Sequence, residues 1–364
     1  MLELDGSTLE GGGQILRTAV GLSTIFKKPC RIFNIRKGRK KPGLMNQHLL
    51  GLQALSRFCD GRLEGDYLGS DEIKFYPGQN YKKDVSINIK TAASIPLILQ
   101  TLIPPALISP FPVEINFTGG ATDTFFSPTI DYFKYIFLKI LEKMGIKIEI
   151  NILKKGYYPE GGAKVKVKIH PLQNFISQNL RGRSFGLKPL NLIERGKLNK
   201  ILIISGASES LKNKKVAERQ IAGTREVLGK LKLPIEERVD YYLAQCPGSQ
   251  ICLITEFVNT FLGTDNLGKL GKRAEDVGKE AALELLKQEK TGACLDKNLA
   301  DLILPYVILT KSKSQIKVSE ITNHTKTNIW VIERFTKNTI NFKEIFLNGK
   351  FEIKDNLISW IPKT

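Results

Sequence analysis

The sequence predicts a protein of alternating helices and strands whose strands join into mixed rather than purely parallel sheets. Three observations support this fold class. Helical and strand patterns alternate along the chain, several strand pairs are joined by short links, and glycine-rich segments recur. Short links favour antiparallel neighbours, because parallel strands need a long crossover connection.

The elements follow from the spacing of apolar residues. Alternating apolar and polar residues, typical of half-buried strands, occur at 31–35, 85–89, 113–117, 146–152 and 163–169. Apolar residues at helical spacing occur at 13–26, 46–59, 130–144 and 274–288. The uncharged stretch 91–113 is long enough to span a bilayer, but five prolines break it and Gln100 lies in its middle. It therefore predicts a buried helix followed by a turn and a strand.

Two features predict the domain organisation. Glu-Gly-Gly occurs in "LEGGGQI" (9–15) and "PEGGAKV" (159–165), with another Gly-Gly in "FTGGATD" (117–123), which suggests repeated supersecondary units. The stretch 181–276 is polar and Lys-rich, with a strand at "KILIIS" and a helix near 213–231. We predict a smaller domain at 181–276, inserted into a larger one formed by 1–180 plus 277–364.

The cysteines and the first residues indicate in which cellular compartment the protein is expected. The five cysteines are odd in number and lack CxxC spacing, which argues against a disulfide framework or a zinc site. The opening residues have neither the basic nor the apolar region of a signal peptide. The sequence thus predicts a cytoplasmic protein without a membrane span, and leaves its oligomeric state open, a homodimer included.

The charge of the chain points to a polyanionic partner. The 364 residues carry a formal net charge of +19, and the isoelectric point is about 9.6. RNA, DNA, a nucleotide or an anionic membrane would suit such a surface. The alternative is a thermostable, Lys-rich surface without a specific partner.

The stretch "LEGGGQILRTAVGLS" (9–23) places three glycines before a predicted helix. Glycines allow close backbone approach, so that amide groups at the helix N-terminus can face an anion. Glu10 beside such a turn suggests a cation that bridges it to phosphates, and Arg17 could reach the same place. The alternatives are a tight turn that needs glycine and an arginine on a solvated helix face. Neither a Walker loop nor a GxGxxG motif is present.

A basic loop follows in "RIFNIRKGRKKPGLMNQHLL" (31–50). Arg36 and Arg39 are three residues apart in a turn that contains glycine, so both could converge on one phosphate. Gln47 and His48 open the next predicted helix. A solvated loop is the alternative, but the position between a strand and a helix favours an anion site.

Of the three histidines, His170 is expected at the surface after a strand, and His48 is expected to be packed and satisfied. His324 lies in "SEITNHTKTNIWVIERF" (319–335), just before a segment that we interpret as an apolar strand. The sequence around it has no Cys/His cluster, which argues against zinc. A catalytic imidazole there could serve as general base or as a nucleophile toward phosphorus.

Five ordered motifs give the chain a resemblance to a known family. "LDGSTLEGGGQILRTAVGLS", "IRKGRKKPGLMNQHL", "TAASIPLILQTLIP", "GYYPEGG" (156–162) and "NHTKTNIWVIERF" (323–335) are similar to segments of the RNA 3′-terminal phosphate cyclases. The resemblance covers most of 1–170 and 270–335 and is weak in the proposed insertion.

The resemblance implies an α+β fold of three repeated βαβαββ units with a smaller inserted α/β domain. It also implies conversion of an RNA 3′-phosphate to a 2′,3′-cyclic phosphate with ATP and a divalent metal, Mg or Mn. In this family a histidine attacks the α-phosphate of ATP to form a covalent histidyl-AMP and release pyrophosphate. The AMP then passes to the RNA 3′-phosphate, giving RNA(3′)pp(5′)A, and the neighbouring 2′-OH displaces it.

The resemblance also implies roles for individual residues. His324 matches the nucleophile, and Glu10 matches the acidic residue that holds the metal. Arg36, Arg39 and Gln47 match residues that bind substrate phosphates. The positions that match the nucleotide-binding residues are Arg17, Gln100, Pro128, Asn298 and Asp301.

Two positions depart from the family pattern. Asn298 stands where a tyrosine is common, and Leu302 stands where a glutamine is common. Loss of the aromatic ring removes a stacking surface for adenine, worth about 1–3 kcal/mol by analogy with base–aromatic stacking. Phe125 or Phe126 could replace it. Nucleotide preference is therefore left open.

Three other functions remain as alternatives. Cyclase-like proteins of ribosome assembly share the fold but lack the nucleophile, and the presence of His324 disfavours them. An enolpyruvyl transferase has related repeats but no covalent nucleotide. A plain RNA-binding protein would use the basic loop only for backbone contacts.

Overall fold

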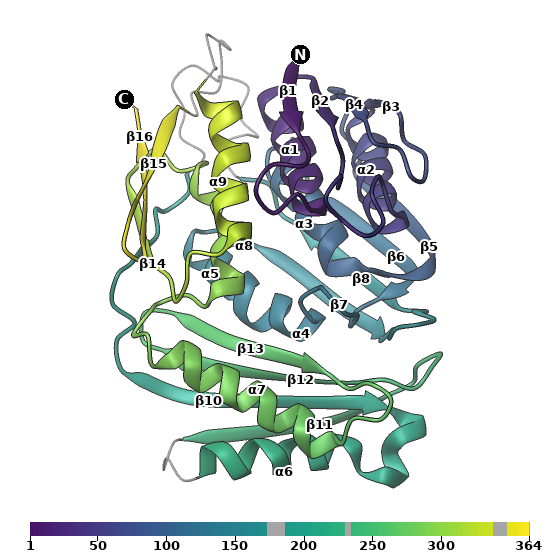
Figure 1. Cartoon of the computed structure of the whole chain (residues 1–364), viewed down its shortest axis with the longest axis vertical. Helices are drawn as coiled ribbons and strands as arrows, with labels where there is room; N and C mark the ends of the chain where they lie inside the picture. Colours follow the sequence, from purple (N-terminus) through teal and green to yellow (C-terminus); the bar gives the residue numbers. More distant parts are fainter. Residues whose placement is uncertain (173–185, 230–233, 338–347, 364) are drawn as a thin grey trace.

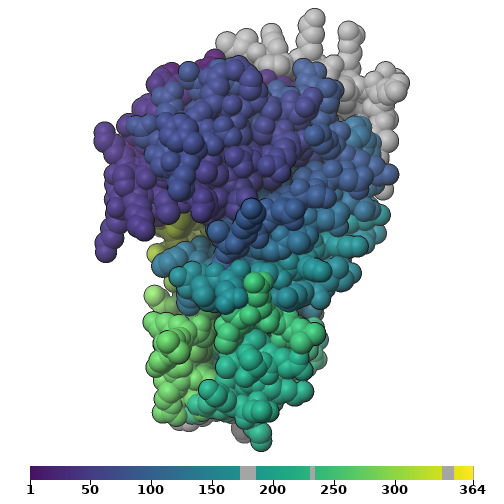
Figure 2. Space-filling view, turned by 90° about the vertical axis from the view of Figure 1, so that its right-hand side faces the viewer, coloured from purple at the N-terminus to yellow at the C-terminus, as the bar shows by residue number. Residues whose placement is uncertain are grey.

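The structure, a computed structural model, describes residues 1–172, 186–229, 234–337 and 348–363. Within these residues the strands form four sheets of four strands each (Figure 1). Three sheets and most helices make up the larger, upper part of the molecule. The fourth sheet and its two helices form the narrower lower part (Figures 1 and 2). Helices and strands are mixed throughout, so the α+β class is confirmed.

The first three sheets account for most of the elements. The first contains β1 (Leu2–Asp5), β2 (Cys30–Phe33), β3 (Arg62–Glu64) and β4 (Ile73–Tyr76), with α1 (Gly13–Phe26) and α2 (Asn46–Cys59). The second contains β5 (Asp84–Ser94), β6 (Val113–Ala121), β7 (Ile148–Lys154) and β8 (Lys164–Ile169), with α3 (Ile95–Ala106), α4 (Ile130–Tyr132) and α5 (Leu138–Lys143). The third contains β9 (Asn191–Leu192), β14 (Ser314–Lys317), β15 (Gly349–Lys354) and β16 (Leu357–Pro362), with α8 (Lys297–Val307) and α9 (Asn323–Thr336).

These three sheets pair their strands in one order. The parallel pairs are β1 with β2, β5 with β6, and β9 with β14. In each sheet the second strand of that pair then joins an antiparallel strand from the hairpin that follows. The mixed sheets predicted from the short links are therefore present.

The fourth sheet has a core of its own. It consists of β10 (Leu198–Ser208), β11 (Ile235–Tyr242), β12 (Ser249–Phe257) and β13 (Phe261–Leu267), with α6 (Val216–Leu228) and α7 (Ala274–Glu289). Leu253 and Leu262 from the strands pack with Val277 and Leu285 from α7. The boundary predicted at 276 falls inside α7, which packs on this sheet beyond that residue. The boundary predicted at 180, and the end of the helix predicted near 213–231, lie outside the described residues.

The uncharged stretch 91–113 forms the end of β5 and then the predicted helix, turn and strand, which are buried α3, a turn and the start of β6. Pro96 lies in the first helical turn, where a missing N–H costs nothing, and Pro104 and Pro105 lie in the last. In the described part of the chain, no helix combines the length and apolarity needed to cross a bilayer. All five cysteines are buried and free.

Two predicted elements differ from the structure. The predicted helix 130–144 is divided by a π-helical turn, Phe133–Phe137, between α4 and α5. The strand predicted after His324 is wrong, because the segment is helix α9. Thr322 caps this helix by accepting a hydrogen bond from the backbone N–H of Thr325 (3.1 Å), and Ile329, Ile332 and Phe335 recur at helical spacing on its buried side.

Candidate active site

Helices from the two ends of the chain bring the predicted site together. α1 lies beside α9 (Figure 1), and the loop before α1 is held by a hydrogen bond from the backbone N–H of Glu10 to the hydroxyl of Thr327 in α9 (3.2 Å). A cleft of about 1140 Å³ opens at this place. All ten predicted site residues line it: Glu10, Arg17, Arg36, Arg39, Gln47, Gln100, Pro128, Asn298, Asp301 and His324.

His324 lies in the first turn of α9 with a half-exposed side chain, and its two ring nitrogens face different residues. Its Nδ1 lies 2.6 Å from the amide oxygen Oε1 of Gln14, and its Nε2 lies 3.7 Å from the carboxylate oxygen Oε1 of Glu10. Burial, together with the positive charges of Arg17 and Arg39, lowers the pKa of His324 below its ordinary value. This shift favours the neutral form of the imidazole.

Gln14 connects His324 to the interior of the cleft. Its amide nitrogen donates to the Oδ2 of Asp301 (2.6 Å), while its amide oxygen faces His324. Burial raises the pKa of Asp301 to about 7, against the opposing effect of Arg17. Burial also lowers the pKa of Arg17 to about 10, although Asp301 opposes that shift.

Arg39 and Arg36, three residues apart in the basic loop, have different partners. Arg39 pairs with the carboxylate of Glu10 and also donates to its backbone carbonyl (2.9 Å). Arg36 instead donates to two carbonyls of its own loop, those of Lys41 (2.5 Å) and Gly43 (3.0 Å). The loop therefore brings both guanidinium groups to the cleft, but only Arg39 contacts Glu10.

Gln47 and His48 hold the start of α2. The Gln47 side chain donates to the carbonyl of Ser94 (3.2 Å) and accepts the Ser94 backbone N–H, so it joins α2 to α3 while lining the cleft. His48 is packed, as predicted, and its Nδ1 accepts the Met45 backbone N–H (3.1 Å). Its ring also explains Gly13, because a Cβ there would lie 2.1 Å from His48 Nε2.

Two donors beside the cleft are buried without a partner. Of the described side chains that have a buried polar atom without a hydrogen bond, Arg17 (Nε) and Gln100 (Nε2) line the cleft. A buried donor without a partner costs free energy, about 1–3 kcal/mol. A ligand with acceptor oxygens or ring nitrogens at this depth would satisfy both atoms.

The remaining predicted residues lie around the same cleft. Asn298 is exposed in the first turn of α8, whose cap Asp296 accepts its backbone N–H (2.9 Å). Pro128 precedes Thr129, which caps α4. Phe125 and Phe126, proposed as replacements for the missing tyrosine, also line the cleft.

Two residues of this site, Gln14 and Asp265, were not predicted from the sequence. Gln14 belongs to the EGGGQ segment, so its place in the motif was a signal. Asp265, a single carboxylate in β13, lines the cleft and accepts the Thr129 backbone N–H (2.6 Å). Nothing in its local sequence indicates this. In the described ranges, no group of three or more His, Cys, Asp or Glu residues could hold a metal, so a metal at Glu10 would need oxygen ligands from elsewhere.

Comparisons with known proteins identify the family to which the chain is similar. The chain matches the family described as RNA 3′-terminal phosphate cyclase over residues 8–342. A protein of that name from Pyrococcus abyssi is 42% identical over 92% of this chain and 93% of its own length. Its counterpart from Thermococcus kodakarensis is 43% identical over 93% of each chain. The one from Caldivirga maquilingensis is 39% identical over 99% of each.

Proposed function

The chain belongs to the RNA 3′-terminal phosphate cyclase family, and we propose that it converts an RNA 3′-phosphate to a 2′,3′-cyclic phosphate with ATP through AMP bound covalently to His324. One observation carries this proposal. The Nε2 of a half-exposed histidine lies 3.7 Å from Glu10, in a cleft that is also lined by Arg17, Arg36 and Arg39.

In the first step, His324 attacks the α-phosphate of ATP. Gln14 donates from its amide nitrogen to Asp301, so its oxygen is left to accept the Nδ1–H of His324. The proton then resides on Nδ1, and the lone pair of Nε2 is free to form the P–N bond as pyrophosphate leaves. The lowered pKa of His324 keeps this nucleophile unprotonated.

The cationic side chains suit the charge that this step moves. Arg17 and Arg39 offset charge on the α-phosphate and on the departing pyrophosphate. The unpartnered donors of Arg17 and Gln100 fit the acceptors of a nucleotide. Glu10 would hold a divalent metal as its single carboxylate ligand, which suits Mg because that ion keeps several waters and binds phosphate oxygens. When bound, the metal supplies further neutralisation of phosphate charge.

In the later steps, an oxygen of the RNA 3′-phosphate attacks the phosphorus of the histidyl-AMP and frees His324. The 2′-OH of the same ribose then attacks the 3′-phosphate, loses its proton and displaces AMP. Ring closure is intramolecular, and good orientation in such reactions contributes up to about 7–11 kcal/mol. The sum is one ATP consumed for one cyclic phosphate, with AMP and pyrophosphate released.

We also propose that the chain has the repeated units and the inserted domain expected for the family. The three sheets with a common pairing order are the three βαβαββ units, and the chain between β9 and α8 is the inserted domain. The common order of parallel and antiparallel pairs and the separate core around β10–β13 support this interpretation.

The test is transfer of label from α-labelled ATP to the protein in the presence of a divalent metal. We expect acid-labile label on the wild type and none on His324→Ala. His170→Ala is the matched control and should label normally, because this histidine follows β8 and pairs with Glu149 of β7 in the second sheet. Equal labelling of wild type and His324→Ala would reject the assignment. If the wild-type protein binds RNA but never becomes labelled, it is instead a non-catalytic, cyclase-like RNA-binding protein.

A further inference from the structure

Three aromatic side chains in or beside the cleft are exposed. Phe125 and Phe126, in the loop between β6 and α4, both line the cleft. Phe125 is 39% exposed and Phe126 fully exposed. Tyr158, 57% exposed, packs edge-on against Phe125 with 5.8 Å between ring centroids. We propose that these three residues, the aromatic rim, stack bases at the 3′ end of the RNA strand, an inference that rests on the proposed function.

The backbone of the rim is strained at its most exposed residue. Phe126 has a φ of 62°, in the left-handed region that bulky residues rarely adopt. Such strain persists where the surrounding structure enforces it, commonly at ligand sites. A fully exposed ring on a strained backbone contributes little to the fold, whereas stacking against a base would make use of both features.

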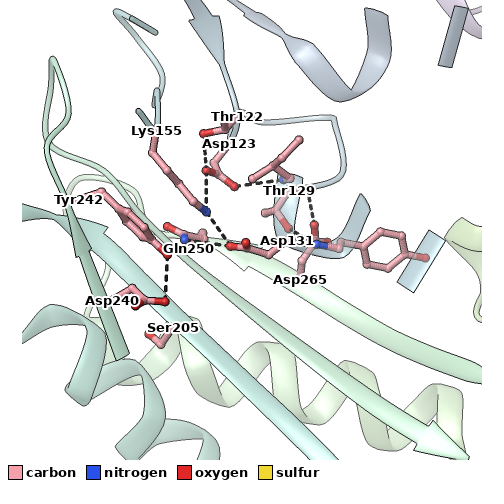
Figure 3. A network of polar contacts seen from close by, with 12 residues as sticks. Thr122, Asp123, Thr129, Asp131, Lys155, Ser205, Asp240, Tyr242, Gln250 and Asp265 are labelled. Carbon is pink, nitrogen blue, oxygen red and sulfur yellow. Dashed lines mark hydrogen bonds and ion pairs between the residues drawn. The ribbon is translucent and has the colours of Figure 1, made fainter. Parts of the chain in front are cut away.

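A buried network fixes the loop that carries the two phenylalanines (Figure 3). Asp123, near the start of the loop, and Asp131, just after its end, both contact the Lys155 ammonium, at 3.3 and 2.6 Å. The fourth sheet adds two contacts, from Gln250 to Asp131 (3.1 Å) and from Thr129 to Asp265 (2.6 Å). The loop is therefore ordered before a ligand arrives, which lowers the entropy cost of binding.

The cleft has a deep part and an exposed edge. We assign the adenine of ATP to the deep part and a base of the RNA to the aromatic rim at the edge. The unpartnered nitrogens of Arg17 and Gln100 are buried, so a nucleotide bound to them lies deep in the cleft. The side chains of the aromatic rim are exposed, where they are accessible to a strand whose 3′ end enters the cleft. Exposed Lys40 and Lys41 line the same cleft and can contact backbone phosphates of that strand. Aromatic platforms beside basic grooves are how single-stranded RNA is bound.

The test measures binding of a short RNA with a 3′-phosphate, in the absence of ATP. One RNA carries the fluorescent base 2-aminopurine at its last nucleotide, and a second lacks that base. The protein variants are Phe126→Ala, Phe126→Leu as an apolar control of similar size, and Phe126→Trp as a rescue. Phe125→Ala is a second, independent variant. Melting curves check that each variant is folded, and cyclisation of the same RNA is followed separately.

We expect the wild type to quench 2-aminopurine and to bind the RNA without the base about tenfold more weakly. Phe126→Ala and Phe126→Leu should lose the quenching and bind both RNAs equally, while Phe126→Trp should restore the difference. Equal affinity of the wild type for both RNAs would overturn the proposal. Loss of ATP-dependent protein labelling in Phe126→Ala would overturn it in favour of adenine. A wild type that cyclises RNA yet ignores the missing base would refute the aromatic rim and leave the proposed function standing.

Discussion

The charged residues of the cleft and those of the buried network around Lys155 are arranged in opposite ways. Lys155 is 1% exposed, and its ammonium is enclosed by the carboxylates of Asp123 and Asp131 (Figure 3). In the cleft, Arg39 is 42% exposed and shares one carboxylate, that of Glu10, with His324. Positive charge thus remains in the cleft, whereas the network is closed by its own residues.

The pKa shifts of the two regions follow this difference. In the network, Asp123 and Asp131 raise the pKa of Lys155 well above its ordinary value, although burial opposes them. In the cleft, burial and the surplus cations lower the pKa of His324. In the network one ammonium faces two carboxylates, so no cationic charge is left over, whereas the cationic charge that remains in the cleft is available to an anion.

The largest expected effect is on stability. Lys155→Met leaves Asp123 and Asp131 buried without their cation, so we expect the free energy of unfolding to fall by about 3–5 kcal/mol. Urea denaturation followed by circular dichroism measures this value. The control is Lys139→Met, which breaks an exposed pair with Glu142 and should cost less than about 1 kcal/mol.

If Lys155→Met does not fold, a double variant still tests the role of the network. The double variant Lys155→Met with Asp131→Asn removes one of the stranded carboxylates and should recover part of the lost stability. A loss below about 1 kcal/mol in the single variant would contradict the role given to the network.

The next effect concerns the residue that links the cleft to His324. Gln14→Leu removes the acceptor for the Nδ1 of His324, and we expect protein labelling from ATP to slow by about 10- to 100-fold, because a misplaced reacting group loses orientation. Gln53→Leu, on α2 and paired with Asp66, is the matched control. Labelling of Gln14→Leu at the wild-type rate would show that the imidazole does not need this contact.

The helices were predicted correctly where the apolar residues recur at a clear helical period, and wrongly where they do not. α1 and α2 fit their predicted ranges because their apolar residues recur at helical spacing without interruption. The α9 segment was misinterpreted because it contains Ile329, Trp330, Val331 and Ile332 in succession, which favours a strand locally. The segment is nevertheless helical, because Thr322 caps its N-terminus and the helix packs against α1.

The candidate site was predicted through motif resemblance, and the contacts within it were not. Asp265 reaches the cleft only because the fourth sheet docks beside α4, a tertiary arrangement with no local sequence signal. The pairing of Arg39 with Glu10 joins residues far apart in the chain and likewise depends on the fold. Spacing alone suggested instead that Arg39 and Arg36 share one phosphate.

A smaller effect is expected at the cationic side of the cleft. Arg39→Ala removes one of the charges that offset phosphate, and we expect adenylylation of the protein or transfer to RNA to slow at least about tenfold. Its stability should change by less than about 0.5 kcal/mol, because the side chain is partly solvated. Arg62→Ala, which breaks an exposed pair with Glu64, is the control for both readings. Unchanged rates in both steps would contradict the prediction.

The smallest effect is a shift in pH dependence. Neutral imidazole is the nucleophile, so labelling should fall as the pH drops through the pKa of His324, which burial, Arg17 and Arg39 hold below its ordinary value. Arg39→Ala removes one of these cations. This change favours the protonated imidazole, so the acid-side midpoint should move to higher pH. Labelling rates measured between about pH 5 and 8 test this, with Arg62→Ala as the control that should keep the wild-type midpoint. A midpoint that stays in place or moves to lower pH in Arg39→Ala would mean that Arg39 does not act on the charge of His324.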